Sequence, residues 1–213
     1  MSKASLLDLE YVVFDFETTG LHPERGDEII EIGAIKLRGE EPTGETFQTL
    51  VNIQKPIPKE ATQVNGIKDE DLVGKPLLQD VFPQFIQFIG TKILIAHNAE
   101  FDLGFLKKVL RLFPSFSFSN HCIDTLQLSR MLFSYEKSHN LDALANRFGL
   151  FPEEFVDGRH RSLGDCFLTA KIFGEFLKFL KRKRTATLHD IRSCLLSIPK
   201  ATPVLVEESL QLF

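Results

Sequence analysis

Two acidic side chains lie two positions apart at the end of a short apolar run. Asp15 and Glu17 follow the β-branched and aromatic residues 11–14, and the run stops at Thr18. Strand side chains alternate with a period of two, so both carboxylates leave the same face. Two anions on one face of an apolar strand are costly unless a cation neutralises them. Taken alone, the pair also fits a salt bridge to Lys or Arg, or a solvated strand end.

Two later segments carry further acids together with a histidine. Residues 97–102 are His-Asn-Ala-Glu-Phe-Asp after an apolar run, and residues 160–165 are His-Arg-Ser-Leu-Gly-Asp before a long amphipathic stretch. We expect Asp102 in the first turn of a helix, near the sheet edge where ligands bind in open α/β folds. Taken singly, Asp102 and Asp165 are acids that a helix dipole favours, and His160 is a loop histidine. Combined with the acid pair on the strand, they indicate a functional site.

The elements that must position these residues follow a simple order. Apolar and β-branched runs predict strands at 11–17, 29–37, 46–53, 93–96 and 122–123. Apolar residues at helical spacing predict helices at 77–89, 101–113, 141–148 and 163–181, a helix starting near Asp124, one helical turn at 69–72 and a short helix at 188–198. Three strands followed by strand–helix alternation predict an α/β fold. Its mixed sheet should have about five strands, the first three an antiparallel meander, with flanking helices.

Composition narrows the class of protein further. The chain has 213 residues and a formal charge of −4, which excludes a strongly basic surface as its main means of holding nucleic acid. Its three cysteines are widely spaced and form no CxxC, so a disulfide framework or a thiolate zinc site is not expected. No apolar run approaches the roughly 20 residues of a membrane span, and residues 1–10 make a poor signal peptide. We therefore expect a cytoplasmic protein.

Three segments resemble the three motifs of a nuclease family. Residues 14–21 (Phe-Asp-Phe-Glu-Thr-Thr-Gly-Leu), 97–102 and 160–165 resemble those of the DEDDh 3′–5′ exonucleases, which include the DnaQ-like proofreading ε subunit of bacterial DNA polymerase III. Their order and spacing match, and a His separated by four residues from an Asp marks the DEDDh branch. The resemblance covers roughly residues 9–182 and implies a ribonuclease H-like fold. Residues 64–67 and 124–126 resemble secondary segments of the family.

The resemblance implies a set of metal ligands and a general base. Asp15, Glu17, Asp102 and Asp165 would bind two divalent metals, Mg²⁺ or Mn²⁺, with Asp15 bridging both. Oxygen ligands suit these hard cations. Two such ions about 3.5–4 Å apart can stabilise the attacking and leaving oxygens of an in-line phosphoryl displacement. His160 would be the base, because an imidazole with a pKa near ~6.5 accepts a proton close to neutral pH.

The resemblance also implies how substrate is held. Backbone around Thr18 would meet the terminal 3′-OH, Leu21 and Phe101 would pack on the last base, and Asn65 would contact the terminal nucleotide, although many relatives have His there. Leu21 and Phe101 could instead belong to the core. The implied function is a metal-dependent 3′–5′ exonuclease that releases nucleoside monophosphates from single-stranded or frayed DNA 3′ ends, with proofreading as its first expected role. The alternatives are RNA 3′-end trimming or oligoribonucleotide clearance, and an inactive module that docks a polymerase on its clamp.

The last part of the chain differs in composition from the rest. Residues 183–213 are expected to form a basic linker, a short helix and a tail. The final pentapeptide, Ser-Leu-Gln-Leu-Phe, resembles the sliding-clamp-binding peptide Gln-Leu-x-Leu-Phe, with Ser209 in place of the first Gln. Leu210, Leu212 and Phe213 are the candidate partner-binding residues, because such peptides dock apolar side chains into a groove from a tether. The same three side chains could instead cap the core.

Overall fold

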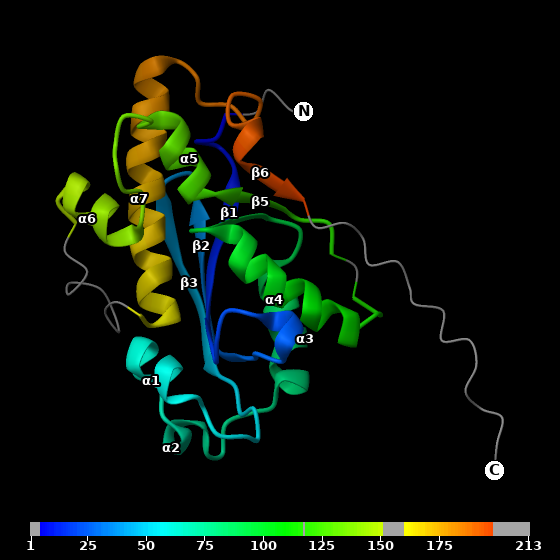
Figure 1. Cartoon of the computed structure of the whole chain (residues 1–213). Coiled ribbons are helices and arrows are strands. Elements are labelled where there is room, and N and C mark those ends of the chain that lie inside the picture. Colours follow the sequence, from blue (N-terminus) through cyan, green and yellow to red (C-terminus); the bar gives the residue numbers. More distant parts are fainter. Residues whose placement is uncertain (1–4, 117, 151–159, 198–213) are drawn as a thin grey trace, which may run out of the picture.

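The computed structural model describes residues 5–116, 118–150 and 160–197, and its centre is one mixed sheet (Figure 1). The strand order is β3-β2-β1-β4-β5-β6. The strands are β1 (Glu10–Thr18), β2 (Ile29–Arg38), β3 (Glu41–Leu50), β4 (Ile93–Ala96), β5 (His121–Asp124) and β6 (Leu195–Ser197). The first three are antiparallel, β4 is parallel to β1 and to β5, and β6 is antiparallel to β5. The predicted mixed α/β fold with its antiparallel meander is confirmed.

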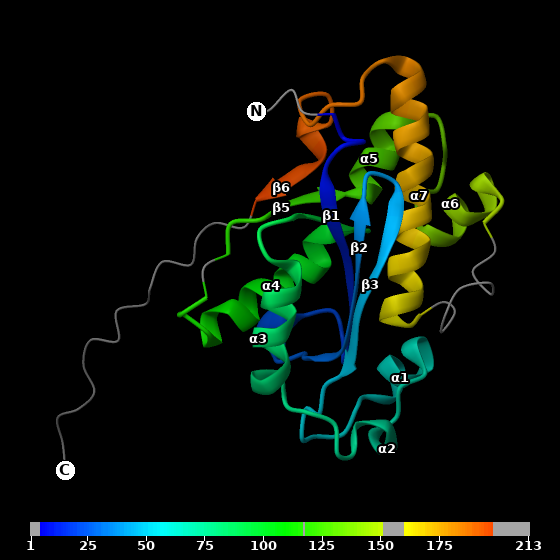
Figure 2. The same cartoon turned by 180° about the vertical axis from the view of Figure 1, so that it is seen from behind.

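Helices cover both faces of the sheet. They are α1 (Lys59–Asn65), α2 (Asp69–Leu72), α3 (Leu78–Ile89), α4 (Ala99–Leu112), α5 (Thr125–Leu132), α6 (Leu141–Phe148) and α7 (Ser162–Lys183). Helix α7, with α5 and α6 beside it, lies on one face, and α3 and α4 lie on the other (Figure 1, and from behind in Figure 2). Helices α1 and α2 lie beyond one end of the sheet. No helix among the described residues combines the length and apolar character that a membrane span requires.

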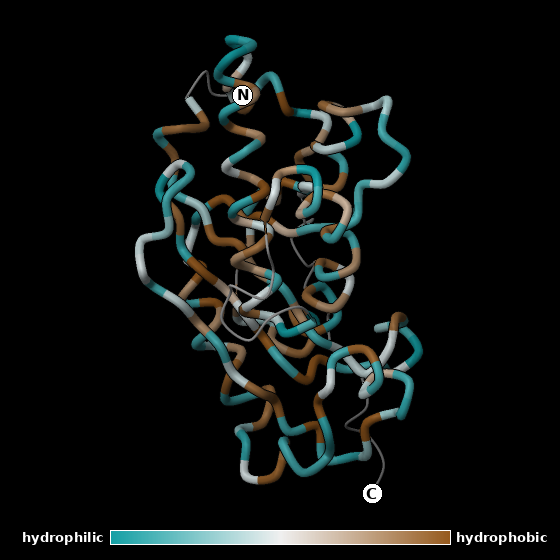
Figure 3. The backbone as a smooth tube through the Cα atoms, turned by 90° about the vertical axis from the view of Figure 1, so that its left-hand side faces the viewer, coloured by the Kyte–Doolittle hydropathy of each residue, from teal (hydrophilic) through white to brown (hydrophobic). Residues whose placement is uncertain are grey.

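Alternate residues of β1 supply two separate hydrophobic cores. Tyr11 and Val13 pack with Phe173 of α7 on one face. Val12 and Phe14 pack on the other face with residues of α3 and α4. In Figure 3 hydrophobic segments run through the interior of the molecule, and most loops at its periphery are hydrophilic. The same alternation places Asp15 and Glu17 on the α7 face of the sheet.

The C-terminal part of the described chain departs from the sequence-based prediction. The helix expected over 188–198 is wrong, because this segment forms a short 3₁₀ turn (Arg192–Cys194) followed by β6. Strand β6 pairs with β5 and brings the sheet to six strands, one more than expected. Ile191 and Cys194 are buried, and an apolar spacing of three residues fits such a turn as well as a helix. The unpaired edge of β5 provides backbone partners that sequence periodicity does not reveal.

Two further differences concern the neighbourhood of the third strand. That strand was expected over 46–53, whereas β3 spans Glu41–Leu50 and pairs along β2 in this register. Helix α1 was not predicted at all, since its seven residues are too few to show an apolar repeat. The other predicted helices and strands match observed elements within a few residues. The candidate partner-binding residues Leu210, Leu212 and Phe213 lie outside the described residues.

Candidate metal and active site

Three acids converge where β1 meets the start of α7. One carboxylate oxygen each from Asp15, Glu17 and Asp165 lies within 4.8 Å of the others. The strand supplies the first two side chains, which are partly buried, and the first turn of α7 supplies the third, which is buried. At a separation of 4.8 Å, two carboxylates repel by roughly 3 kcal/mol at an effective dielectric constant of about 20. A divalent cation bound between them would remove this repulsion, and the oxygen donors suit such an ion.

A glycine on β2 allows α7 to reach these acids. Gly33 is the register partner of Asp15 on the neighbouring strand. A Cβ atom at Gly33 would lie 2.5 Å from the backbone carbon of Ser162, the first residue of α7. Only a residue without a side chain lets the helix backbone lie directly on the strand here. Since Asp165 follows in the same helical turn, this close contact brings it to Asp15.

Asp102 is held against the backbone of β1 from the direction of α4. The N–H of Phe16, which lies between Asp15 and Glu17, donates to Oδ1 of Asp102 at 3.0 Å. Strand β4 ends at Ala96, and the parallel pairing between β4 and β1 does not extend to Phe16. Asp102 is outside the group of three acids defined by the 4.8 Å limit, but it adjoins that group through this hydrogen bond.

Burial sets the charge of Asp102. The carboxyl group is buried, and this burial raises its pKa from 3.8 to about 8. The hydrogen bond from Phe16 lowers the pKa, and the charges of Asp124 and Asp165 raise it further. Without a cation nearby, Asp102 therefore holds a proton at neutral pH. A metal ion would have to displace this proton in order to bind the carboxylate.

A second buried acid, Asp124, connects the segments that lead into α4 and α5. Oδ1 of Asp124 accepts hydrogen bonds from the N–H of Asn98 (3.2 Å) and from the N–H of Leu126 (2.9 Å). Asn98 has a φ of 61°, and this left-handed residue begins the turn into α4. His97 Nδ1 lies 2.9 Å from Thr125 Oγ1, so the two loops are connected by side chains as well. These contacts determine the direction of the helix that carries Asp102.

His160 lies at the entrance to α7. It is exposed and has a left-handed φ of 59°, in the turn that precedes Arg161 and the helix. This conformation is uncommon for a residue with a side chain. The turn puts His160 five residues before Asp165, at the end of α7 where the acids converge.

The four predicted substrate-binding residues have different environments. Nδ2 of Asn65 donates to the carbonyl oxygen of Thr18 at 3.4 Å, so these two residues are in contact. Thr18 also donates its hydroxyl proton to the carbonyl oxygen of Gly20 at 2.7 Å. Leu21 is 70% exposed, which excludes it from the core. Phe101 is half-buried, and its ring centroid lies 5.2 Å from that of Phe105.

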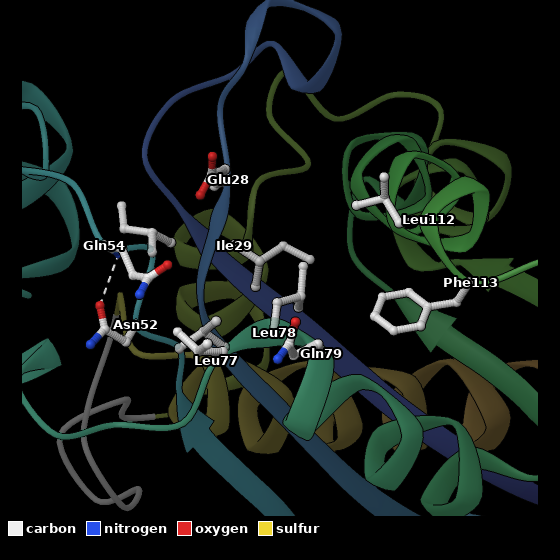
Figure 4. A pocket seen from close by; sticks show the side chains of 11 residues that line it. Glu28, Ile29, Asn52, Gln54, Leu77, Leu78, Gln79, Leu112 and Phe113 are labelled. Carbon is white, nitrogen blue, oxygen red and sulfur yellow. Dashed lines mark hydrogen bonds between the residues drawn. The ribbon is translucent and has the colours of Figure 1, made fainter. Parts of the chain in front are cut away.

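A pocket of about 390 Å³ lies apart from the acids. Figure 4 shows Ile29, Leu78 and Phe113 directed toward it, with the amides of Asn52 and Gln54 at its rim. None of Asp15, Glu17, Asp102 and Asp165 lines this pocket. The acid cluster and this pocket are therefore separate features of the surface.

Comparison with protein families gives the same result as the geometry. Residues 12–173 match the exonuclease family, and this match includes all four acids and His160. The chain belongs to the exonuclease family. The resemblance to the DEDDh exonucleases is thereby confirmed.

Curated relatives of the chain are bacterial proteins whose names refer to DNA polymerase III. The chain is 36% identical over 176 residues to the DNA polymerase III subunit epsilon of Aquifex aeolicus, covering 83% of this chain and 84% of that protein. It is 41% identical over 189 residues to a DNA polymerase III subunit epsilon-like protein of Rhodobacter capsulatus, covering 88% of this chain but 26% of the relative. PolC-type DNA polymerase III of Caldanaerobacter subterraneus is 39% identical, and the chain spans 13% of it. The chain thus spans about a quarter or less of several longer relatives.

Solved structures share the fold of this chain. Exonuclease X in complex with a 5′-overhanging duplex DNA has a TM-score of 0.65 at 24% identity, covering 83% of this chain and 97% of that chain. The nuclease domain of 3′hExo, a DEDDh family member bound to rAMP, has a TM-score of 0.67 at 21% identity, covering 92% and 100%. Both support the ribonuclease H-like architecture.

Two residues beside the acids, Glu31 and Arg161, were missed by the sequence-based predictions. Glu31 on β2 is fully buried, and the guanidinium of Arg161 donates to both of its carboxylate oxygens. A charged residue inside an apolar strand was the available signal. The sequence did not show which cation neutralises it, because the partner lies 130 residues away.

Proposed function

We propose that this chain is a metal-dependent 3′–5′ exonuclease that releases nucleoside monophosphates from DNA 3′ ends. The observation that carries the proposal is the convergence of Asp15, Glu17 and Asp165 within 4.8 Å, with Asp102 bonded to the strand between them. Membership of the exonuclease family and the similarity to bacterial epsilon subunits support the same function.

Asp15, Glu17, Asp102 and Asp165 would hold two divalent cations, for which we propose Mg²⁺ or Mn²⁺. When bound, such ions supply charge stabilisation for an in-line displacement at phosphorus. The carboxylates orient the ions and offset their charge. Two divalent ions together carry a charge equal in magnitude to the −4 of the whole chain. Asp15 lies further inside the strand than Glu17, and it is the ligand that we assign to both ions.

His160 acts as the general base in this mechanism. Its exposed position in the turn before α7 lets the imidazole take a proton from the attacking water and pass it to solvent. It is not assigned as a metal ligand. Its left-handed backbone directs the chain from the turn into the helix that carries Asp165.

The 3′-terminal nucleotide is held by residues at the end of β1, just beyond it and in α4. The backbone at Thr18, to which Asn65 donates, is assigned to the 3′-OH. The exposed side chain of Leu21 and the half-buried ring of Phe101 supply apolar surface for the last base. Apolar contact with a base tolerates any sequence, as an exonuclease requires.

A nuclease assay tests this function directly. End-labelled single-stranded DNA and an RNA of matched sequence are incubated with the full chain and Mg²⁺, Mn²⁺ or EDTA. We expect metal-stimulated release of mononucleotides from the 3′ end of DNA and none with EDTA. Faster hydrolysis of RNA would favour trimming or clearance of RNA, because the 2′-OH distinguishes the substrates. No release from either would favour an inactive docking module.

The biological setting that we propose is proofreading beside a cytoplasmic replicative polymerase. The relatives named DNA polymerase III subunit epsilon support this setting. We further propose that Leu210, Leu212 and Phe213 bind the sliding clamp. Deleting residues 209–213 should abolish clamp binding and leave hydrolysis of free oligonucleotides unchanged. Unchanged clamp affinity in the deleted chain would contradict this assignment.

A further inference from the structure

Near the proposed metal site, the buried carboxylate of Glu31 is paired with the guanidinium of Arg161. Glu31 accepts hydrogen bonds from Arg161 Nη2 (2.6 Å) and Nε (3.1 Å), from Gln48 Nε2 (3.1 Å) and from the N–H of Ser162 (3.0 Å). These donors come from β3, from the residue before α7 and from the first residue of α7. Four donors on one fully buried carboxylate join the sheet to the start of the helix.

The position of Glu31 relates this ion pair to the proposed chemistry. Glu31 is the register partner of Glu17, and two residues further Gly33 is the partner of Asp15. The Glu31 carboxylate therefore lies on the same face of the sheet as the acid cluster. Arg161 stands directly after His160, so the guanidinium holds the turn in which the proposed base lies.

The energetics argue against stability as the purpose of the pair. Desolvating two charges costs several kcal/mol, and apolar residues of similar volume often serve equally well in such a position. The pair instead fixes the orientation of the turn before α7, because the planar guanidinium donates two hydrogen bonds in a fixed geometry. The bond from Ser162 N–H fixes the first residue of α7 at the same carboxylate.

We propose that Glu31 and Arg161 form a positioning clamp for His160 and Asp165. The clamp holds the turn at 160–162 against β2, so that Asp165 meets Asp15 and Glu17 and the imidazole faces the reacting water. Glu31 does not compete for metal in this arrangement, because Arg161 neutralises it. The inference rests on the proposed function, and both residues act through others rather than on substrate.

The experiment compares four variants of the full chain with the wild type. Glu31→Gln and Arg161→Met each remove one charge, the double variant removes both, and Arg161→Lys keeps the charge but loses the two-bond geometry. The matched control is Arg38→Met, which removes an exposed pair with Glu10 at the other end of β2. Each protein is measured for urea unfolding, for Mn²⁺ affinity by calorimetry, and for kcat and KM on single-stranded DNA.

If Glu31 and Arg161 form this clamp, the changes in stability and in function should not run in parallel across the variants. The single charge removals should unfold at lower urea concentration, and the double variant should recover most of that loss. The double variant and Arg161→Lys should nevertheless show Mn²⁺ affinity and kcat lowered by about 10–100-fold, as for other residues that orient metal ligands. KM should change by less than about twofold, since substrate contacts the end of β1. The control should match the wild type.

Two results would overturn the clamp. One is a double variant that recovers stability together with wild-type Mn²⁺ affinity and kcat. The other is a folded Arg161→Lys variant with wild-type values for both. Failure of the proposed function gives a different result, because the wild-type chain would then release no nucleotides. The ratio of Mn²⁺ affinities between wild type and variants would still decide for or against the clamp.

Discussion

Two groups of acids lie side by side on the α7 face of β1 and β2 and differ in what neutralises them. Glu31 is fully buried and takes four hydrogen bonds from the chain, two of them from Arg161. Asp15 and Glu17 are partly buried and approach a third carboxylate, that of Asp165. A glutamate on β2 therefore serves in an internal ion pair, while its register partner on β1, Glu17, serves, as we propose, in cation binding.

Asp102 shows a third way to hold an acid at this place. Its carboxyl group is buried like that of Glu31, but burial raises its pKa to about 8, and protonation removes its charge. Burial alone therefore does not distinguish structural from functional carboxylates. The counter-charge does, whether it is an arginine, a proton or a metal ion.

The largest effect should follow removal of the acid assigned to both ions. Asp15→Ala is expected to lower kcat by at least about 10³-fold, since bound metals supply several kcal/mol of transition-state stabilisation. Glu10→Ala removes an exposed acid from the start of the same strand and should leave kcat unchanged. The nuclease assay with Mg²⁺ measures both variants. Equal activities of the two variants would contradict the assignment of Asp15 as a metal ligand.

A smaller loss is expected when the proposed base is removed without touching the acids. His160→Ala should lower kcat by roughly 10²–10⁴-fold. Its Mn²⁺ affinity should stay at the wild-type value, because the imidazole is not a ligand in this account. Single-turnover kinetics and calorimetry on the same sample make the measurement. Loss of bound Mn²⁺ would assign His160 to the ligands instead.

The pH dependence of stability in Asp102→Asn tests whether Asp102 is protonated in the metal-free chain. Because the folded pKa of about 8 exceeds 3.8, the folded metal-free chain binds the extra proton between these values. Its free energy of unfolding should therefore fall as pH rises through this window. The amide introduced by this substitution keeps an acceptor for Phe16 N–H but has no proton to lose, so the variant should unfold at higher urea than wild type at pH 8. A wild-type curve that rises with pH, matched by the variant, would contradict the raised pKa.

The smallest effect concerns the contact that brings α7 to the sheet. Gly33→Ala should lower the free energy of unfolding by about 1–3 kcal/mol, because its Cβ would meet the Ser162 backbone. Gly104→Ala in α4 is the matched control, since its Cβ would lie 3.5 Å from Pro23 Cγ, an ordinary contact. That control should be neutral or stabilising by up to about 1 kcal/mol. Urea unfolding of the two variants gives the comparison, and equal losses would argue against a close contact at Gly33.

Local patterns were sufficient for most of the fold. The strand period of two placed Asp15 and Glu17 on one face, and the helical spacing over 77–89 and 141–148 gave the positions of α3 and α6. The failures have different causes. Strand β6 forms because β5 has a free edge, and the seven residues of α1 show no periodic signal of their own.

The candidate site divides in the same way. Three segments that resemble the motifs of a family identify the four acids and His160 from the sequence alone. The sequence could not show that Asp102 would be protonated, because this depends on its burial in the folded chain and on the nearby charges of Asp124 and Asp165. It also could not pair Glu31 with Arg161, since the contact joins residues 130 positions apart.

Titration of the metal-free chain with Mn²⁺ by calorimetry measures whether the four acids bind two cations. We expect two bound ions per wild-type chain and weakened binding of both in Asp15→Ala, whereas Glu31→Gln should still bind two ions at reduced affinity. A wild-type chain that binds no Mn²⁺, or an Asp15→Ala variant that binds two ions with unchanged affinity, would contradict this expectation.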